Sequence, residues 1–276
     1  MVAERKSEGA IVDAHVHLYD CFDVHGFLSG ASHNLRAAAA SLGRTHAATS
    51  VLMLTETNRE NGFDRLLQLA GSCRTDGLPP GCWSVQRIPN DPAAVAATSA
   101  DGTAIIVVAG RQIISSEGLE VLALGTDKAI SNGASLAELV DAVNSVKAIP
   151  VIPWGVGKWL GRRGQVVKSF IESPASSTVF LGDILGRPVF WPRSSVFRRA
   201  AARGIDVLPG TDPLPLETET PRAGSCGFYI DCDLASGPPS VVLKEALRVD
   251  PLTILPFIRR ESTWRFFRNQ ARMRLQ

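Results

Sequence analysis

The chain has 276 residues, 45% of them hydrophobic, which is enough to bury the core of one large α/β domain. With 29 basic and 27 acidic residues the net charge is only +2, which argues against a bulk field that would attract nucleic acid or a membrane surface. No apolar run reaches transmembrane length, and the five cysteines lack CxxC spacing. These features predict a reduced compartment, and we expect a cytoplasmic protein.

Strand-like and helix-like segments alternate along the chain. A buried strand is predicted at 11–16, an Ala-rich helix near 33–42, a strand at 50–54 and a helix at about 61–73. Ser135 and Glu138 have the spacing of a capping box that opens a helix to about Val146. Further apolar strands are predicted at 104–108, 119–124, 149–152, 178–181 and 205–208.

Strands that recur with helices between them predict a parallel sheet with right-handed crossovers. Seven or so such units favour a distorted (β/α)7 TIM-like barrel over an open doubly wound sheet. We expect a single domain over 1–276, with its core at about 11–215 and a C-terminal helical extension at about 216–276. No GxGxxG or Walker-type loop follows a strand, which argues against a nucleotide-cofactor fold.

The C-terminal segment is basic and aromatic. Six arginines stand beside Trp264, Phe266 and Phe267, which is typical of an amphipathic helix with a basic outer face. We expect this helix to dock onto the barrel or onto a second copy of the chain, with nucleic acid only a minor alternative. Asp250 and Pro251 predict the N-cap and first turn of another helix. The arginines are Arg259, Arg260, Arg265, Arg268, Arg272 and Arg274.

Two histidines one residue apart, His15 and His17, lie at the end of the first strand. Side chains at i and i+2 share one face of a strand, so Asp13, His15 and His17 should project together from its carboxyl end, where barrels build their sites. Two imidazoles and a carboxylate suit a divalent transition metal such as Zn, Mn or Fe. The sequence therefore predicts a metal site; the alternative is a strand with two half-exposed histidines.

Four later strands offer a carboxylate at or near the same rim. Asp212 ranks first as a further ligand, then Glu56, Asp183 and Glu120. Each has another interpretation: Asp212 could shape a turn, Asp183 could pair with Arg187, and Glu120 could be solvated on an edge strand. All five histidines lie in the first sixth of the chain, so ligands from later strands must be carboxylates, amides or cysteines.

The segment from Trp154 to Trp159 is flanked by glycine and followed by basic residues. With Lys158, Arg162 and Arg163 it is typical of a mobile cationic loop that could hold a phosphate or carboxylate. The alternative is an ordinary helix N-terminus with surface arginines. The two tryptophans could close a lid or fill the core.

These motifs resemble those of the PHP (polymerase and histidinol phosphatase) family, whose fold is a distorted seven-stranded α/β barrel. The segment from Asp13 to His17 resembles its opening Asp-x-His-x-His, and 55–58 is similar to its Thr-Asp-His-Asn. Residues 110–112 and 119–124 resemble a third motif, 153–155 a fourth, and 210–214 the closing Gly-Ser-Asp-x-His. The order and spacing hold over 11–214.

The resemblance implies a metal-dependent hydrolase, phosphoesterase-like, that attacks a small anionic substrate with a metal-activated water. The family's two- or three-metal cluster cannot be complete in this chain. Other residues occupy the remaining ligand positions of the family, namely Gln112, Thr57, Glu120, Trp154 and Leu214. His15, His17, Asp212 and Glu56 remain, with Asp13 beside them, which is enough for one metal ion.

The same resemblance assigns roles to the remaining polar residues. Asp183 or Glu120 would be the general base, and Lys158 with Arg187 would hold the anion, helped by Trp154 and Arg162. Two other functions stay open: an amidohydrolase-type enzyme that cleaves an amide or lactone, and a barrel that binds a metal or anion without catalysis.

Overall fold

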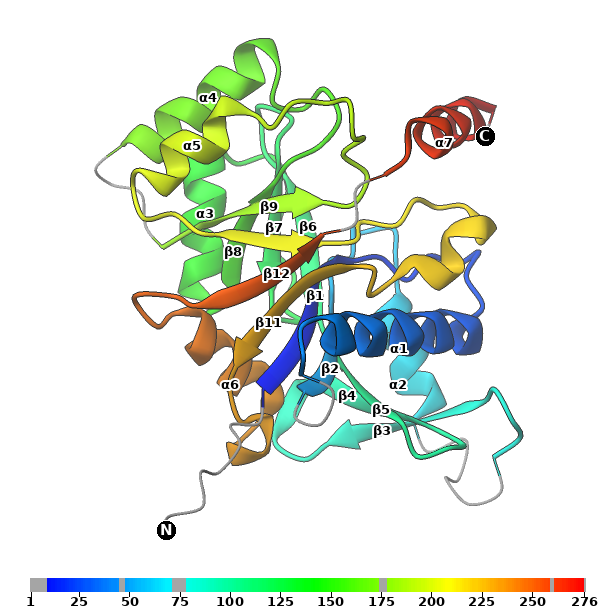
Figure 1. Ribbon diagram of the computed structural model, residues 1–276. Coiled ribbons are helices and arrows are strands. Elements are labelled where there is room, and N and C mark those ends of the chain that lie inside the picture. Colours follow the sequence, from blue (N-terminus) through cyan, green and yellow to red (C-terminus); the bar gives the residue numbers. More distant parts are fainter. Residues whose placement is uncertain (1–8, 45–47, 71–77, 174–177, 259–260, 276) are drawn as a thin grey trace.

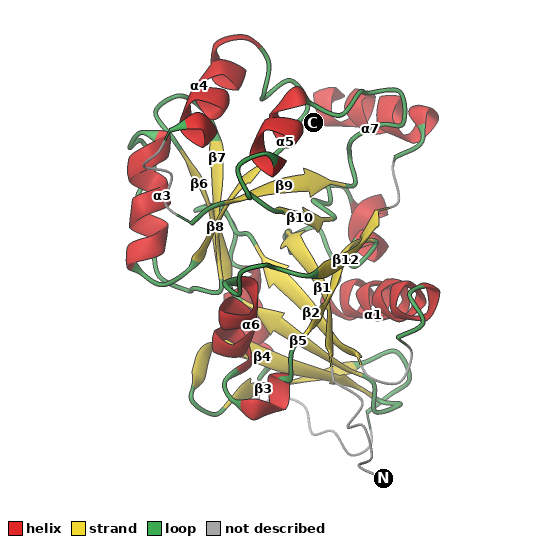
Figure 2. Ribbon diagram, turned by 60° about the vertical axis from the view of Figure 1, so that its left-hand side comes forward, coloured by secondary structure: helices red, strands yellow, loops and turns green. Residues whose placement is uncertain are grey.

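Two mixed β-sheets form the framework of the protein, with helices on their outer sides (Figures 1 and 2). The computed structural model describes residues 9–44, 48–70, 78–173, 178–258 and 261–275. The seven-stranded sheet has the order β12-β11-β1-β2-β5-β4-β3, and the five-stranded sheet has the order β10-β9-β8-β7-β6. The described residues form no closed barrel, so the prediction of a (β/α)7 barrel is wrong.

The strands of the larger sheet come from both ends of the chain. They are β1 (Gly9–Val16), β2 (Ala48–Leu54), β3 (Trp83–Ile88), β4 (Asp91–Ser99), β5 (Ala104–Val108), β11 (Cys226–Asp231) and β12 (Ile254–Ile258). The smaller sheet comes from the middle of the chain, with β6 (Gly110–Ile114), β7 (Glu120–Leu124), β8 (Ile149–Pro153), β9 (Phe180–Ile184) and β10 (Val207–Gly210).

Seven α-helices and two short 3₁₀ helices are described. The helices α3, α4 and α5 lie beside the five-stranded sheet, and α1 lies against β1 and β2 (Figure 1). Their bounds are α1 (Val24–Ser41), α2 (Gly62–Leu69), α3 (Leu136–Ser145), α4 (Gly161–Glu172), α5 (Ser195–Ala201), η1 (Glu217–Arg222), η2 (Leu234–Ser236), α6 (Pro239–Leu247) and α7 (Thr263–Leu275). None of the described helices is long and apolar enough to cross a membrane.

Short antiparallel connections explain why the barrel prediction failed. Only two residues separate β3 from β4, and four separate β4 from β5. A parallel crossover needs about a dozen residues or more, whereas antiparallel strands need only a turn. Asn90, between β3 and β4, has a φ of 62°, which suits such a turn. The predicted elements do not include β3, β4 and β6 as separate strands, so the remaining strands were expected to run parallel.

The C-terminal extension is not purely helical. β11 pairs antiparallel with β1, Gly9 opposite Asp231, and β12 pairs antiparallel with β11. No helix begins at Asp250; the next element along the chain is β12. The predicted terminal helix is present as α7. Residues after 215 therefore complete the larger sheet and also supply a helix that lies apart from it (Figure 1).

Several local predictions are confirmed. Ser135 caps α3 by accepting a hydrogen bond from the backbone N–H of Glu138, whose carboxylate accepts one from the N–H of Ser135. The helix predicted near 33–42 begins earlier, at Val24, because the Asp23 side chain caps it. The expected end of the 61–73 helix lies partly outside the described residues.

The two sheets meet at two seams. At one, the Asp212 N–H donates to the His15 carbonyl over 2.7 Å; at the other, the Glu56 N–H donates to the carbonyl of Gly110 over 3.1 Å. Glycine is needed at both: a Cβ on Gly210 would lie 2.4 Å from the His15 backbone nitrogen, and a Cβ on Gly110 would lie 2.2 Å from the Leu54 carbonyl. The absence of a side chain at Gly210 lets β10 approach the carboxyl end of β1, and its absence at Gly110 lets β6 approach the carboxyl end of β2.

Apolar side chains fill the space between the sheets. Val12 and Ala14 of β1 belong to one buried cluster with Leu122, Val151 and Leu208 of the smaller sheet. β1 is buried along its whole length, and its pairing with β2 shifts register between Asp13 and Val16. This irregularity changes the direction of successive side chains at the point where the candidate ligands lie.

Replacing Gly210 by alanine should destabilise the fold. The new methyl group would strike backbone atoms of β1, which cannot rotate away, so we expect a loss of about 1–3 kcal/mol in the free energy of unfolding, at the upper end of that range. Urea denaturation measures it. Gly186→Ala is the matched control, because its methyl group would meet only the Ile184 Cδ1 at 3.5 Å. Equal midpoints for the two variants would contradict the assigned role of Gly210.

Candidate metal centre

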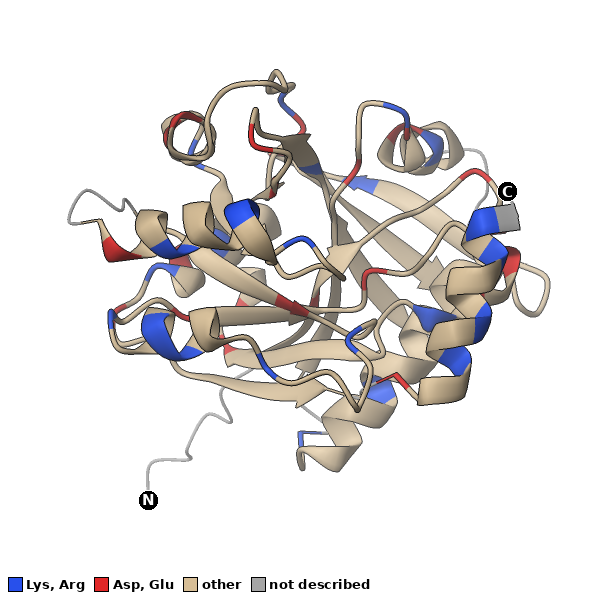
Figure 3. Cartoon of the chain, turned by 90° about the horizontal axis from the view of Figure 1, so that it is seen from above, with Lys and Arg blue, Asp and Glu red and all other residues tan. Residues whose placement is uncertain are grey.

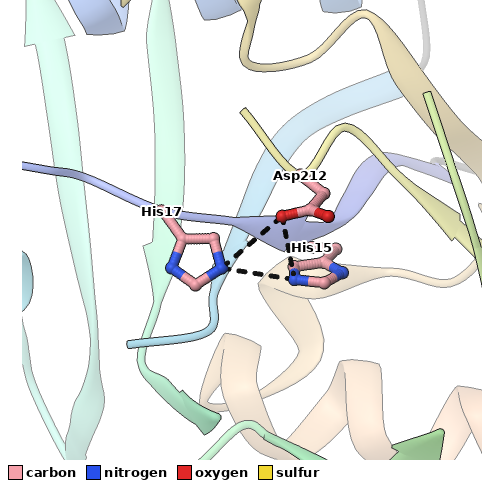
Figure 4. A group of neighbouring side chains, drawn as sticks. All are labelled: His15, His17 and Asp212. Atoms are coloured by element: carbon pink, nitrogen blue, oxygen red, sulfur yellow. Dashed lines mark hydrogen bonds and ion pairs between the residues drawn. The ribbon is translucent and has the colours of Figure 1, made fainter. Parts of the chain in front are cut away.

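Three predicted ligands converge at the seam between β1 and β10 (Figure 4). His15 lies near the end of β1, His17 follows it, and Asp212 follows β10. The His15 Nε2 lies 3.3 Å from the His17 Nε2, and the Asp212 Oδ1 lies 3.5 Å from the first and 3.7 Å from the second. Both histidines are buried and Asp212 is partly exposed, so the group is open on one side.

These spacings fit a divalent ion. Metal–nitrogen and metal–oxygen bonds of about 2.1 Å in a tetrahedron put neighbouring ligand atoms about 3.4 Å apart. The three separations of 3.3, 3.5 and 3.7 Å lie close to that value. The three residues would therefore form one triangular face, leaving a further position for water or substrate. This is the one group of three metal-ligating side chains within 4.8 Å that the described residues contain.

Glu60 orients the second histidine from behind. Its Oε2 lies 2.8 Å from the His17 Nδ1, and the same carboxylate accepts hydrogen bonds from Thr57. A carboxylate on the far nitrogen of a ligating histidine sets its tautomer and increases its basicity. The sequence reading missed Glu60; its only signal is that it lies in the loop after β2, four residues beyond Glu56.

The surroundings of the two rings differ. Burial lowers the pKa of His15, which favours the neutral ring that a metal requires. Burial also lowers the pKa of His17, but the hydrogen bond and the charge of Glu60 outweigh it and raise that pKa overall. His17 also stacks on Tyr19, with ring centroids 5.1 Å apart and planes at 10°.

Asp13 does not join the group, although the sequence reading placed it there. Its fully buried carboxylate accepts from the Thr211 N–H and hydroxyl, the Gly224 N–H and the His15 N–H. Burial raises the pKa of Asp13 to about 7, and these hydrogen bonds oppose the rise. All its partners belong to the backbone or to Thr211, so Asp13 connects β1 to the segments after β10 and before β11.

Glu56 also lies outside the group of three candidate ligands. Its Oε1 accepts from the Phe63 N–H at 2.6 Å, and its Oε2 lies 3.4 Å from the Arg111 Nη1. The carboxylate thus satisfies the N-terminus of α2 and one arginine. Burial raises the pKa of Glu56, and its partners limit that effect.

A cavity of about 440 Å³ opens beside the candidate metal centre. His17, Tyr19 and Asp212 contribute to its lining. Glu120 and Lys158 also line it and form an ion pair, and Gln112 donates to Glu120 at 3.3 Å. Residues of η1 and α7, which no sequence pattern connected with the site, complete the lining: Glu219, Arg222, Phe266, Asn269, Gln270 and Met273.

Asp183 and Arg187 form a buried pair. The guanidinium is bidentate, with Nε 3.0 Å from Oδ1 and Nη2 2.8 Å from Oδ2. Asp183 Oδ1 also accepts from the N–H of Ile184. Neither side chain lines the cavity. This geometry agrees with the alternative interpretation of Asp183 in the sequence analysis, a structural ion pair with Arg187.

The tryptophans of the predicted cationic loop are buried. Trp154 packs edge-on against Trp191, and Trp159 packs against Phe197, so both fill the core beneath α4 and α5. Arg162 is exposed on α4 and borders a separate groove beside Glu117. Of this segment, Gly155, Val156 and Lys158 line the cavity.

No protein-family model matches the chain, and no curated protein matches it. Among solved structures it is similar to PsfC from Pseudomonas syringae PB-5123, with a TM-score of 0.51 and 14% identity over 98% of this chain and 100% of that one. It is also similar to PfuEndoQ, a lesion-specific endonuclease from Pyrococcus furiosus, with a TM-score of 0.51 and 11% identity over 89% of this chain and 57% of that one. The structural similarity shows a shared fold, and at these low identities it shows the fold alone.

The expectation that nucleic acid is only a minor alternative as a partner is wrong. PfuEndoQ, with which this chain shares its fold, is an endonuclease, so the fold is compatible with a nucleic-acid partner. The physical reason is that a net charge near zero describes only the sum over the surface. It does not exclude a local basic region, such as the one that Arg268, Arg272 and Arg274 form on α7.

Replacing Glu60 by glutamine should weaken zinc binding by about tenfold, because the neutral amide removes the charge that supports the His17 ring. Isothermal titration of metal-free protein with Zn²⁺ measures the affinity. Glu56→Gln is the matched control: its amide oxygen can still accept from Phe63, and we expect unchanged affinity. A larger loss in Glu56→Gln than in Glu60→Gln would show that Glu56 is the ligand and that Glu60 has no supporting role.

Proposed function

We propose that the protein is a metal-dependent hydrolase of the PHP type that cleaves a phosphate ester. The observation that carries the proposal is the converging set of His15, His17 and Asp212, with Glu60 behind His17 and a cavity beside them. Two imidazoles, one carboxylate and a free position are a donor set typical of hydrolytic sites. The shared fold with an endonuclease supports phosphodiesters as substrates.

A divalent ion held by these residues would lower the pKa of a water and polarise a phosphoryl oxygen. The protein's own groups do the rest. Tyr19 borders the cavity, and burial raises the pKa of its hydroxyl, so it stays protonated and can donate to an oxygen of the ester. Glu120 is the carboxylate we assign as proton acceptor, since it lines the cavity, whereas Asp183 is bound to Arg187.

Lys158 is the cation best placed to hold an anionic substrate. Its ammonium group lines the cavity and has three donors, of which the Glu120 carboxylate takes one. Arg187 donates to Asp183 and lies outside the cavity lining, and Arg162 borders another groove, so neither enters the proposal.

The first test is metal content and metal-dependent turnover. We expect untagged protein to carry about one equivalent of zinc, manganese or iron by elemental analysis, and His15→Ala/His17→Ala to carry none. Hydrolysis of bis-p-nitrophenyl phosphate should stop with a chelator and return when metal is restored. Circular dichroism of the double variant checks that loss of metal is not loss of the fold.

The same assay separates the alternatives. Turnover of a nitroanilide or a lactone without turnover of any phosphoester would favour the amidohydrolase-type function. Metal binding with no turnover on any of these compounds would favour a non-catalytic metal- or anion-binding protein. Absence of metal from the wild-type protein after reconstitution would contradict the proposal altogether.

Lys158→Gln should raise the KM for an anionic phosphoester by about tenfold, because one charge-assisted hydrogen bond to the substrate is lost. Steady-state kinetics with a phosphodiester measures the change. Arg162→Gln, an exposed basic residue outside the cavity, should leave KM unchanged. Equal effects of the two substitutions would indicate a general influence of surface charge instead of a contact.

A further inference from the structure

The outer face of α7 carries exposed aromatic rings beside the candidate site. Trp264 is 76% exposed and Phe267 is 57% exposed, far more than aromatic side chains with a packing role. The Phe267 ring stacks on Phe190, itself 48% exposed, with centroids 5.8 Å apart and planes at 6°. We name Trp264, Phe267 and Phe190 the aromatic platform.

The opposite face of the same helix faces the cavity. Phe266, Asn269, Gln270 and Met273 line it, at the three- and four-residue spacing of one helical face. Asn269 donates to Glu219 at 3.1 Å, and Arg265 pairs with the same carboxylate. The helix is therefore anchored to η1, with one side against the site and the aromatic platform on the other.

Basic residues accompany the aromatic platform. The described part of α7 contains no acidic residue, and Figure 3 shows several blue segments along this helix, which ends near the C label. Arg265 is neutralised by Glu219 and Glu261. Among the described residues no carboxylate lies within 4 Å of the guanidinium groups of Arg268, Arg272 and Arg274. Arg272 and Arg274 are exposed.

We propose that the aromatic platform and the arginines of α7 bind a single-stranded or locally unpaired nucleic acid. Flat rings accept any base by stacking, and guanidinium groups contact the backbone phosphates between the bases. A strand bound there passes the rim of the cavity that holds the three candidate ligands. This inference rests on the proposed phosphoester chemistry and specifies its substrate as a polymer.

Two other partners fit the surface less well. A symmetric contact with a second copy would place arginines that lack a carboxylate partner against one another, and that repulsion opposes the contact. A membrane-bound helix inserts a continuous apolar face, but Phe266 and Met273 line the cavity, which leaves only the aromatic platform, beside arginines, on the outer side of α7.

Binding of fluorescein-labelled oligothymidylate, followed by anisotropy in excess EDTA, tests the proposal without requiring catalysis. We expect Trp264→Ala/Phe267→Ala to weaken binding by about tenfold or more, because at least one stacking contact with a base is lost. Trp264→Phe should keep most of the affinity, because it keeps a ring. Val249→Ala removes an equally exposed apolar side chain elsewhere and should change nothing.

The arginines are tested by the dependence of binding on salt. Arg272→Gln/Arg274→Gln should weaken binding and reduce the slope of log affinity against log salt by about 1 or more. Arg87→Gln/Arg203→Gln removes two exposed arginines from other elements and should leave the slope unchanged. Fully paired duplex should bind more weakly than oligothymidylate, since its bases are not free to stack.

Three results would overturn the proposal. One is wild-type protein that does not bind oligothymidylate; another is equal binding by the wild type and Trp264→Ala/Phe267→Ala. The third is loss, in that variant, of binding to phosphatidylserine vesicles or of self-association, with oligothymidylate binding intact. Because EDTA is present throughout, failure here is distinct from failure of the metal or of turnover, which the elemental and kinetic assays measure separately.

Discussion

The contact between β1 and β10 is the constraint on which the site depends. Gly210 allows the two strands to touch, and the His15 carbonyl then accepts the N–H of Asp212. That single backbone hydrogen bond fixes the distance between an imidazole from one sheet and a carboxylate from the other. The cavity, its charged lining and the wall provided by α7 are all arranged around this point.

Local sequence patterns could indicate the candidate ligands at strand ends, which the structure brings together. His15 and His17 were visible because they follow a buried apolar run, and Asp212 because it follows a short strand and glycine. Asp13 has the same i and i+2 spacing, but the register shift in β1 and four nearby donors direct its carboxylate elsewhere. Glu60 and the α7 wall depend on contacts across the fold, which spacing alone does not encode.

The fold was predicted less well than the ligands, for a related reason. Apolar runs identify strands such as β2 and β5, but they do not state the direction in which neighbours run. The turns around Asn90 and Gly118 reverse the chain in a part of the molecule where only parallel neighbours were predicted. Strands taken as parallel units therefore belong to antiparallel pairs, and two mixed sheets replace the expected barrel.

The Asp13 carboxylate has a kinetic consequence. It joins Thr211 across 198 positions and Gly224 across 211, so its hydrogen bonds close long loops. Loop closure of this length is costly in entropy and contributes to slow folding. His15 and Asp212 depend on the same long-range closure, so a folding intermediate that lacks it would also lack a complete set of candidate ligands.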